Sequence, residues 1–91
     1  MELTVDQALQ RGVAAHKEGK LQNAERFYRA ILQIQPKHPD ANHNLGVLAL
    51  SINMADKALP FFKTAIEINP NVEQFWVSYI KAHIYLKNFD I

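Results

Sequence analysis

Residues 39–72, PDANHNLGVLALSINMADKALPFFKTAIEINPNV, repeat without a gap the pattern of residues 5–38, VDQALQRGVAAHKEGKLQNAERFYRAILQIQPKH. Eight positions are identical at an offset of 34 residues: Asp6/Asp40, Gly12/Gly46, Val13/Val47, Ala15/Ala49, Ala24/Ala58, Phe27/Phe61, Ile34/Ile68 and Pro36/Pro70. Half of these identities are Gly, Ala or Pro, the residue types that steric constraints select. A fixed period of about 20 to 50 residues is typical of stacked repeats, so the period predicts the architecture of the whole chain.

Each unit is predicted to be a helical hairpin, whose first helix we call the A helix and whose second the B helix. Thr4 and Gln7 have the spacing of a capping box, so the first A helix should begin there and run to Lys17. Gly19 supplies a left-handed stop, and the first B helix should occupy residues 21–34. Within it apolar residues recur at helical spacing: Leu21, Ala24, Tyr28, Ile31 and Ile34.

The second unit is expected to follow the same plan. Asn53 stands where Gly19 stood, and Pro60 should cost little if the second B helix begins near Asp56. Beyond Pro70, residues 71–74 repeat the capping pattern before a third A helix. In both full units the A-helix glycines are expected to face alanines on the B helix, so that the two helices approach closely. The predicted pairs are Gly12 with Ala24 and Gly46 with Ala58.

Composition excludes several classes of protein. Of the 91 residues 48% are hydrophobic and 21% charged, which is typical of a folded chain, and the net charge of +1 does not favour a nucleic-acid partner. No cysteine is present, which excludes disulfides, thiolate metal sites and a cysteine nucleophile. The N-terminal segment carries two acids and no long apolar run, so we expect no signal peptide and no membrane anchor, and a cytoplasmic location.

The second unit resembles the tetratricopeptide repeat (TPR) through Leu45, Gly46, Ala58, Phe62, Ala65 and Pro70. This resemblance implies an all-α fold, a right-handed superhelical solenoid of about five helices. It also implies a single domain over residues 1–91, with repeats at about 5–38 and 39–72 and a truncated third repeat at 73–91. One departure is Ile80, which stands at the glycine position of the third unit. The segment of residues 24–50 is similar in sequence to TPR arrays that precede bacterial glycosyltransferase or sulfotransferase domains.

What the resemblance implies for function is protein binding without catalysis. The concave face of such arrays is lined by A helices and binds an extended peptide or a partner helix. The family positions that point into this groove carry over to Leu9, Gln10, Val13, His16, Lys17, His43, Asn44, Val47, Leu50, Ser51, Val77, Ser78, Lys81 and Tyr85. The alternative is that the chain is the substrate-recruiting N-terminal arm of a larger transferase, whose catalytic domain lies outside this sequence.

Two subclasses of groove can be compared residue by residue. The carboxylate clamp that holds acidic chaperone tails needs Lys, Asn, Asn, Lys and Arg at five positions. This chain has Leu9, Val13, Asn44, Gln74 and Ser78 there, so only Asn44 matches. Binding of an acidic chaperone tail is therefore disfavoured. In glycosyltransferase-like arrays an asparagine ladder grips the peptide backbone, and Asn44 fits one rung, with Gln10 and Ser78 as imperfect rungs.

Other chemistries are weaker interpretations of the same residues. His38, Asp40 and His43 are close in sequence, but they lack zinc spacing and are expected to be solvated, so we predict no metal and no cofactor. The serines, Ser51 and Ser78, lie in no nucleophile motif, so we predict no catalytic residue. Residues 26–29, RFYR, could stack on RNA, but the aromatic pair there falls on core positions of the family.

The apolar residues of the third A helix form more than one stripe along its surface, and only one of these stripes can pack on the preceding B helix. We therefore expect self-association through this helix, as a twofold homodimer or by helix exchange between chains. The monomer whose third helix turns its aromatic residues inward is the alternative. The residues expected to mediate self-association are Phe75, Trp76, Tyr79, Ile80 and Ile84.

Overall fold

Five helices follow one another in the described part of the chain, and the expected all-α repeat fold is confirmed. The computed structural model describes residues 3–89, and within that range it has no strand. The helices are α1 (Val5–Lys17), α2 (Leu21–Ile34), α3 (Pro39–Ser51), α4 (Ala55–Ile68) and α5 (Glu73–Phe89). The A helices are therefore α1, α3 and α5, and the B helices are α2 and α4.

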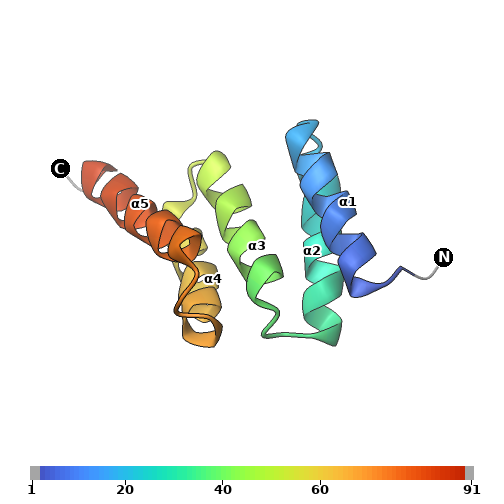
Figure 1. Ribbon diagram of the computed structural model, residues 1–91. Coiled ribbons are helices and arrows are strands. Elements are labelled where there is room, and N and C mark those ends of the chain that lie inside the picture. The colour runs from blue at the N-terminus through green and yellow to red at the C-terminus, as the bar shows by residue number, and fades with distance from the viewer. Residues whose placement is uncertain (1–2, 90–91) are drawn as a thin grey trace.

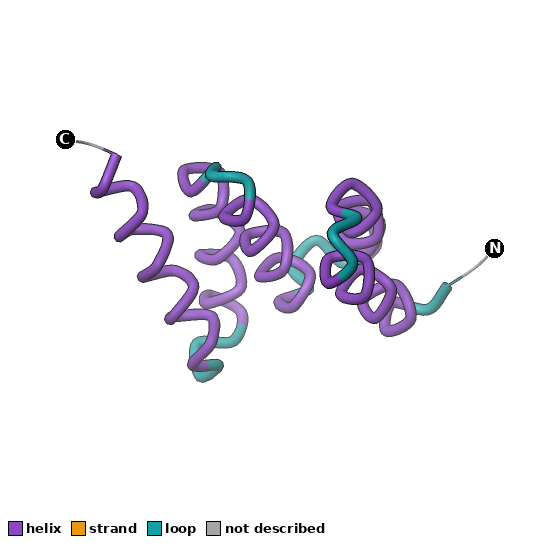
Figure 2. The backbone as a smooth tube through the Cα atoms, turned by 90° about the horizontal axis from the view of Figure 1, so that it is seen from above, coloured by secondary structure: helices purple, strands orange, loops and turns teal. Residues whose placement is uncertain are grey.

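The helices form two layers in an elongated array. In Figure 1 the A helices lie side by side toward the viewer, with α2 and α4 behind them. Consecutive helices pack on one another, and each A helix also contacts the next A helix. The described chain measures 47 × 28 × 19 Å, and Figure 2 shows its two ends at opposite sides of the array.

Local sequence signals explain where the helices begin and end. The Thr4 hydroxyl accepts a hydrogen bond from the Gln7 backbone N–H, and the Gln7 side chain accepts one from the Thr4 N–H, each at 3.0 Å. The predicted capping box is thus confirmed. Gly19 (φ +78°) and Asn53 (φ +62°) both adopt the left-handed conformation, as expected for the two turns between an A helix and its B helix.

The fourth position of a unit secures the turn between units, which the sequence patterns did not suggest. The Asn42 amide donates to the Pro36 carbonyl oxygen at 3.1 Å and to that of His38 at 2.9 Å. One unit later, the Trp76 Nε1–H donates to the Pro70 carbonyl oxygen at 2.7 Å. Asn42 and Trp76 are separated by one period, as are Pro36 and Pro70. The same bond therefore recurs with two different side chains.

Each glycine of α1 and α3 lies beneath an aromatic ring of the following B helix, which is a nearer neighbour than the alanine that we predicted. A Cβ atom placed on Gly12 would lie 2.4 Å from the Tyr28 Cε1, and one placed on Gly46 would lie 2.4 Å from the Phe62 Cε1. Tyr28 and Phe62 are 1% and 0% exposed. The glycine makes room for the ring itself, while Ala24 and Ala58, both fully buried, fill the adjoining part of the core.

Three further local details can be compared with the sequence. Ile34, the last residue of α2, is 71% exposed although it continues the apolar spacing of that helix. Helix α4 begins at Ala55, beside the expected start at Asp56, so Pro60 lies in its second turn and has no N–H to donate to the Asp56 carbonyl oxygen. The capping pattern predicted at residues 71–74 was wrong: helix α5 begins at Glu73, which makes Val72 the residue before the helix and leaves Asn71 too early to cap it.

Replacing Gly46 by alanine should destabilise the protein by roughly 2 kcal/mol, because the new methyl group overlaps a rigid, buried ring. This loss exceeds the gain of about 1 kcal/mol in helix propensity. Urea unfolding of Gly46→Ala in the wild-type and Phe62→Leu backgrounds measures the effect. In the Phe62→Leu background the loss of stability should largely disappear. A higher free energy of unfolding for Gly46→Ala alone would contradict the explanation.

Candidate functional site

The predicted groove residues lie on the three A helices, and the structure separates them by exposure. Six are exposed, six are half-buried and two are buried. The exposed ones are Gln10, Lys17, Ser51, Val77, Lys81 and Tyr85. The half-buried ones are Leu9, Val13, His16, Asn44, Val47 and Leu50. His43 and Ser78 are 9% and 5% exposed, so these two cannot offer their side chains to a peptide.

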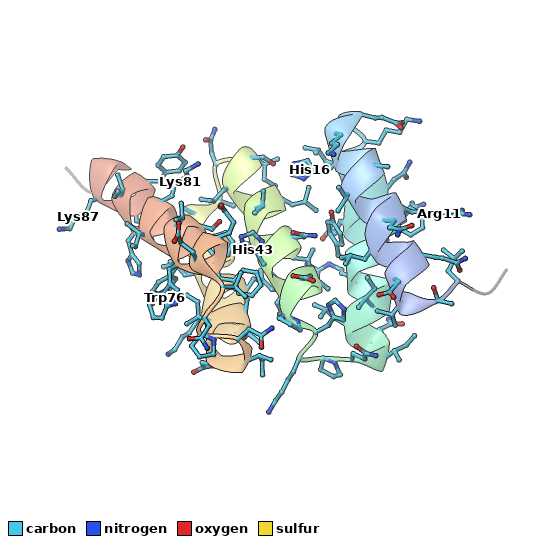
Figure 3. The ribbon with its side chains drawn as sticks, in the orientation of Figure 1. Arg11, His16, His43, Trp76, Lys81 and Lys87 are labelled. Carbon is cyan, nitrogen blue, oxygen red and sulfur yellow. The ribbon has the colours of Figure 1, made fainter. Side chains whose placement is uncertain are left out.

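His43 and Ser78 instead join α3 to α5. The His43 Nε2 and the Ser78 Oγ are 2.8 Å apart, and Figure 3 shows His43 in the space between the two helices. On α5, the Gln74 amide donates to the same Ser78 oxygen at 3.3 Å. On α3, the His43 Nδ1 lies 3.4 Å from the Asn44 Oδ1.

These distances fit one consistent set of donors and acceptors. If the His43 Nδ1 carries the proton and donates to Asn44, its Nε2 accepts from the Ser78 hydroxyl, whose oxygen accepts from Gln74. The neutral imidazole then satisfies both of its ring nitrogens inside the helix packing. A buried polar link of this kind fixes the position of α5 on α3, since each partner left alone would be an unsatisfied buried group.

Aromatic rings enclose the imidazole and keep it neutral. The His43 ring centroid lies 5.4 Å from that of Phe62 and 4.8 Å from that of Phe75. Burial lowers the pKa of His43 below its ordinary value, and the Asn44 hydrogen bond and the Asp40 charge only partly oppose this effect. His43 is therefore a core residue and not the solvated residue that we expected.

A serine hydroxyl within hydrogen-bond distance of an imidazole is also the geometry of a nucleophile and its base. Here the hydroxyl is enclosed between α3 and α5, where an incoming substrate carbonyl has no approach. The contact between Ser78 and His43 thus serves packing between repeats.

The remaining histidines have separate environments. The His38 Nδ1 accepts from the Ala41 backbone N–H at 3.1 Å and so caps α3. His16 points from α1 toward α3 in Figure 3, and the exposed His83 meets the Tyr79 ring edge to face at 4.7 Å. Between residues 3 and 89, no three His, Asp or Glu side chains are grouped so that they could hold a metal ion.

Asn44 is the half-buried polar residue at the centre of the A-helix face. Its Oδ1 lies 3.4 Å from the His43 Nδ1. Burial raises the pKa of the Tyr28 hydroxyl, and a side-chain interaction with Asn44 partly offsets this shift. Gln10 and Ser78 occupy the equivalent positions of the first and third units. Gln10 is exposed and Ser78 is buried, so of the three predicted rungs only Gln10 and Asn44 can reach a ligand.

A cleft of about 450 Å³ lies between α2, α3 and α4 where the two full repeats meet, and we predicted no site there. Glu25 and Arg29, which form an ion pair at 2.7 Å, are among the residues that line it. The apolar residues Ile52 and Met54, which follow α3 directly, are the sequence signal that could have indicated it.

The residues expected to mediate self-association also divide into two groups. Phe75 is 3% exposed and packs on α4, so it was wrongly placed in that set. Tyr79 is half-buried against the same helix. Trp76, Ile80 and Ile84 are 42%, 54% and 52% exposed.

Comparison with known proteins supports the repeat pattern. The family model described as tetratricopeptide repeat matches residues 15–84. A human protein, Protein O-mannosyl-transferase TMTC3, is 30% identical over 70 residues. The aligned segment covers 77% of this chain and 8% of the length of that protein. In the part of the chain described, no helix is both long and apolar enough to cross a bilayer.

Acidification should loosen the contact between α3 and α5. The native state binds a proton at His43 more weakly than the unfolded chain, whose histidines titrate near 6.5. The stability that neutral His43 contributes is therefore fully present above about pH 6.5 and falls as the pH drops below it. Urea unfolding at pH 7.5 and 5.5, above the range of most carboxylates, measures this dependence.

The matched variants are His43→Gln and His83→Gln. The first should flatten the pH dependence between these two values, and the second should leave it, since His83 is exposed. An unchanged slope in His43→Gln would contradict the assignment.

Proposed function

This chain belongs to the tetratricopeptide repeat family, and from that premise we propose that it is a non-catalytic protein-interaction module. Its ligand is an extended peptide or a partner helix that lies across α1, α3 and α5. The observation that carries the proposal is the continuous row of accessible side chains on these helices. Repeat arrays use such a row because each A helix adds one strip to an extended surface.

The chemistry of the row points to a ligand with apolar anchors and a polar backbone contact. Val77 and Tyr85 are 44% and 38% exposed on α5. Lys17 and Lys81 place one cation near each end of the row. A single positive charge at each end does not make a clamp for an acidic tail. A mixed peptide, with apolar side chains between α1 and α5 and at most a few acids, matches this lining.

Asn44 is the residue proposed to hold the peptide backbone. Its Oδ1 is directed at His43 and its side chain also bears on the Tyr28 hydroxyl, so we take the second N–H of the amide as the donor to a peptide carbonyl oxygen. The buried contacts of His43 hold Asn44 in place, which lowers the conformational cost of binding.

A second candidate is the substrate-recruiting arm of a transferase. The matched human relative is named as an O-mannosyl-transferase, and the array resembles those of glycosyltransferase-type proteins. In this version the same groove presents an acceptor polypeptide to a catalytic domain elsewhere in the protein. Reading the natural gene past Ile91 separates the two, because a transferase sequence is required by the second and not by the first. A cytoplasmic location and the absence of membrane or nucleic-acid partners stay predictions.

Random peptides displayed on phage and selected on the immobilised chain test the groove. For the peptides recovered, Asn44→Ala should weaken binding by about 1 kcal/mol, the usual effect of losing one hydrogen bond. Asn23→Ala is the matched control, because Asn23 is exposed on α2, away from the A helices. Calorimetry measures the affinities, and circular dichroism checks the fold. Equal losses in both variants, or unfolding of Asn44→Ala, would show that Asn44 is not a groove residue.

A further inference from the structure

In the part of the chain that the structure describes, nothing covers one face of α5, a stripe made of Glu73, Trp76, Ile80, Ile84 and Lys87. These residues are three or four positions apart, so they share one side of the helix. All five are exposed. The residues that α5 buries against the rest of the array, Phe75, Ser78 and Ala82, lie on a different side. The stripe is thus an apolar centre with an acid at one end and a base at the other.

Ile80 prevents this stripe from being covered in the way the first two units are. It stands in register with Gly12 and Gly46, where an aromatic ring of the B helix lies 2.4 Å from the place of a missing Cβ. A helix with such a ring cannot approach α5 equally closely while Ile80 keeps its side chain. The group that covers the stripe must therefore pack against the isoleucine itself.

Trp76 is already fixed in the orientation that a partner would meet. Its indole N–H donates to the Pro70 carbonyl oxygen, and its ring stands edge-on to Tyr79 with centroids 6.5 Å apart. Since the one polar group of the side chain is used inside the chain, the exposed part of the indole is apolar. An exposed Trp held in one orientation loses little entropy on association.

We propose that α5 pairs with α5 of a second copy of this chain, antiparallel, about a twofold axis at Ile80. The stripe is complementary to itself in that register. Trp76 and Ile84 lie four residues before and after Ile80, and Glu73 and Lys87 lie seven before and after it. Antiparallel pairing sets Ile80 beside the partner's Ile80 and Trp76 beside the partner's Ile84. It also sets Glu73 beside the partner's Lys87, so that both ends of the contact pair opposite charges.

The dimer leaves most of the proposed groove open, and the two surfaces adjoin at Val77, which lies seven residues before Ile84 and so on nearly the same side of α5. In Figure 3 Trp76 and Lys87 extend from one side of α5, and Lys81, a groove residue, extends from the other. The pairing rests on the stripe alone and holds whether or not the groove binds a peptide. If both are present, the dimer carries two grooves, and binding to a partner with two sites gains avidity.

A disulfide at the axis tests the register. The sequence has no cysteine, so a single introduced thiol reports only its own position. Under mild oxidation Ile80→Cys should form a covalent dimer rapidly, because the two residues meet at the axis. Lys81→Cys, one residue further along the helix and facing the groove, should form it at least tenfold more slowly. Equal rates for the two variants, read on non-reducing gels, would overturn the antiparallel register.

Charge exchange tests the ends of the contact. Sedimentation over a concentration series gives the dimer dissociation constant for each variant. Glu73→Lys and Lys87→Glu alone should each weaken the dimer by roughly tenfold, because two ion pairs become repulsive contacts. The double variant restores opposite charges at both ends and should recover most of the loss. Both residues are exposed, so the fold is expected to persist, and circular dichroism verifies it.

The full chain should show a concentration-dependent mass between monomer and dimer that Ile80→Lys shifts to monomer. A chain that stays monomeric at high micromolar concentration would overturn the proposal. So would a double charge variant no tighter than the single ones, since the stripe would then associate without a defined register. Peptide binding by Ile80→Lys is measured in parallel. If Ile80→Lys still binds the peptide, a loss of dimerisation in this variant says nothing against the proposed groove.

Discussion

The approach of an aromatic ring to a bare helix backbone is the contact on which the rest of the array depends. Tyr28 over Gly12 and Phe62 over Gly46 bring each B helix so near its A helix that a Cβ atom would overlap the ring. At that spacing Ala24 and Ala58 lose all contact with water. Because the protein interior is close-packed, the ring cannot move away, and an added Cβ atom would strain the packing. Both hairpins take the same shape since both meet the same requirement.

Stacking of one hairpin on the next uses different contacts in each case. Between the first and second units the contact is mainly apolar: Ala15, Ala24 and Tyr28 pack with Leu45 and Leu48, and the polar component is Asn44 at the Tyr28 hydroxyl. Between α3 and α5 a polar link of His43 and Ser78 lies inside a shell of Phe62 and Phe75. The polar link is directional and depends on an uncharged imidazole, so the third unit has a specified orientation that is sensitive to pH. The recurring bond to the proline carbonyl, from Asn42 and from Trp76, orients each following A helix.

The third unit departs from the first two at the glycine position. Ile80 stands there and exposes an apolar side chain on α5, where α1 and α3 have a bare backbone beneath an aromatic ring. Another helix with such a ring cannot pack there at the same distance. The array therefore has two surfaces that adjoin at Val77: the accessible row across the A helices and the outer stripe of α5.

The sequence alone determined the repeat period, the five helices, the capping box at Thr4 and the left-handed turns at Gly19 and Asn53. Each of these depends on residues near one another in the chain, or on a period that can be counted. The groove residues came from the resemblance to the TPR family, and on the A helices all of them except His43 and Ser78 are exposed or half-buried. The partner of each glycine, the burial of His43 and Ser78, and the division of α5 into three sides could not be obtained in that way. They depend on which side chains of separate helices come into contact, and a displacement by the size of one ring or one methyl group would change those contacts. Only the packed structure places His43 of one repeat beside Ser78 of the next, because the distance between those helices is set by contacts that no local pattern records.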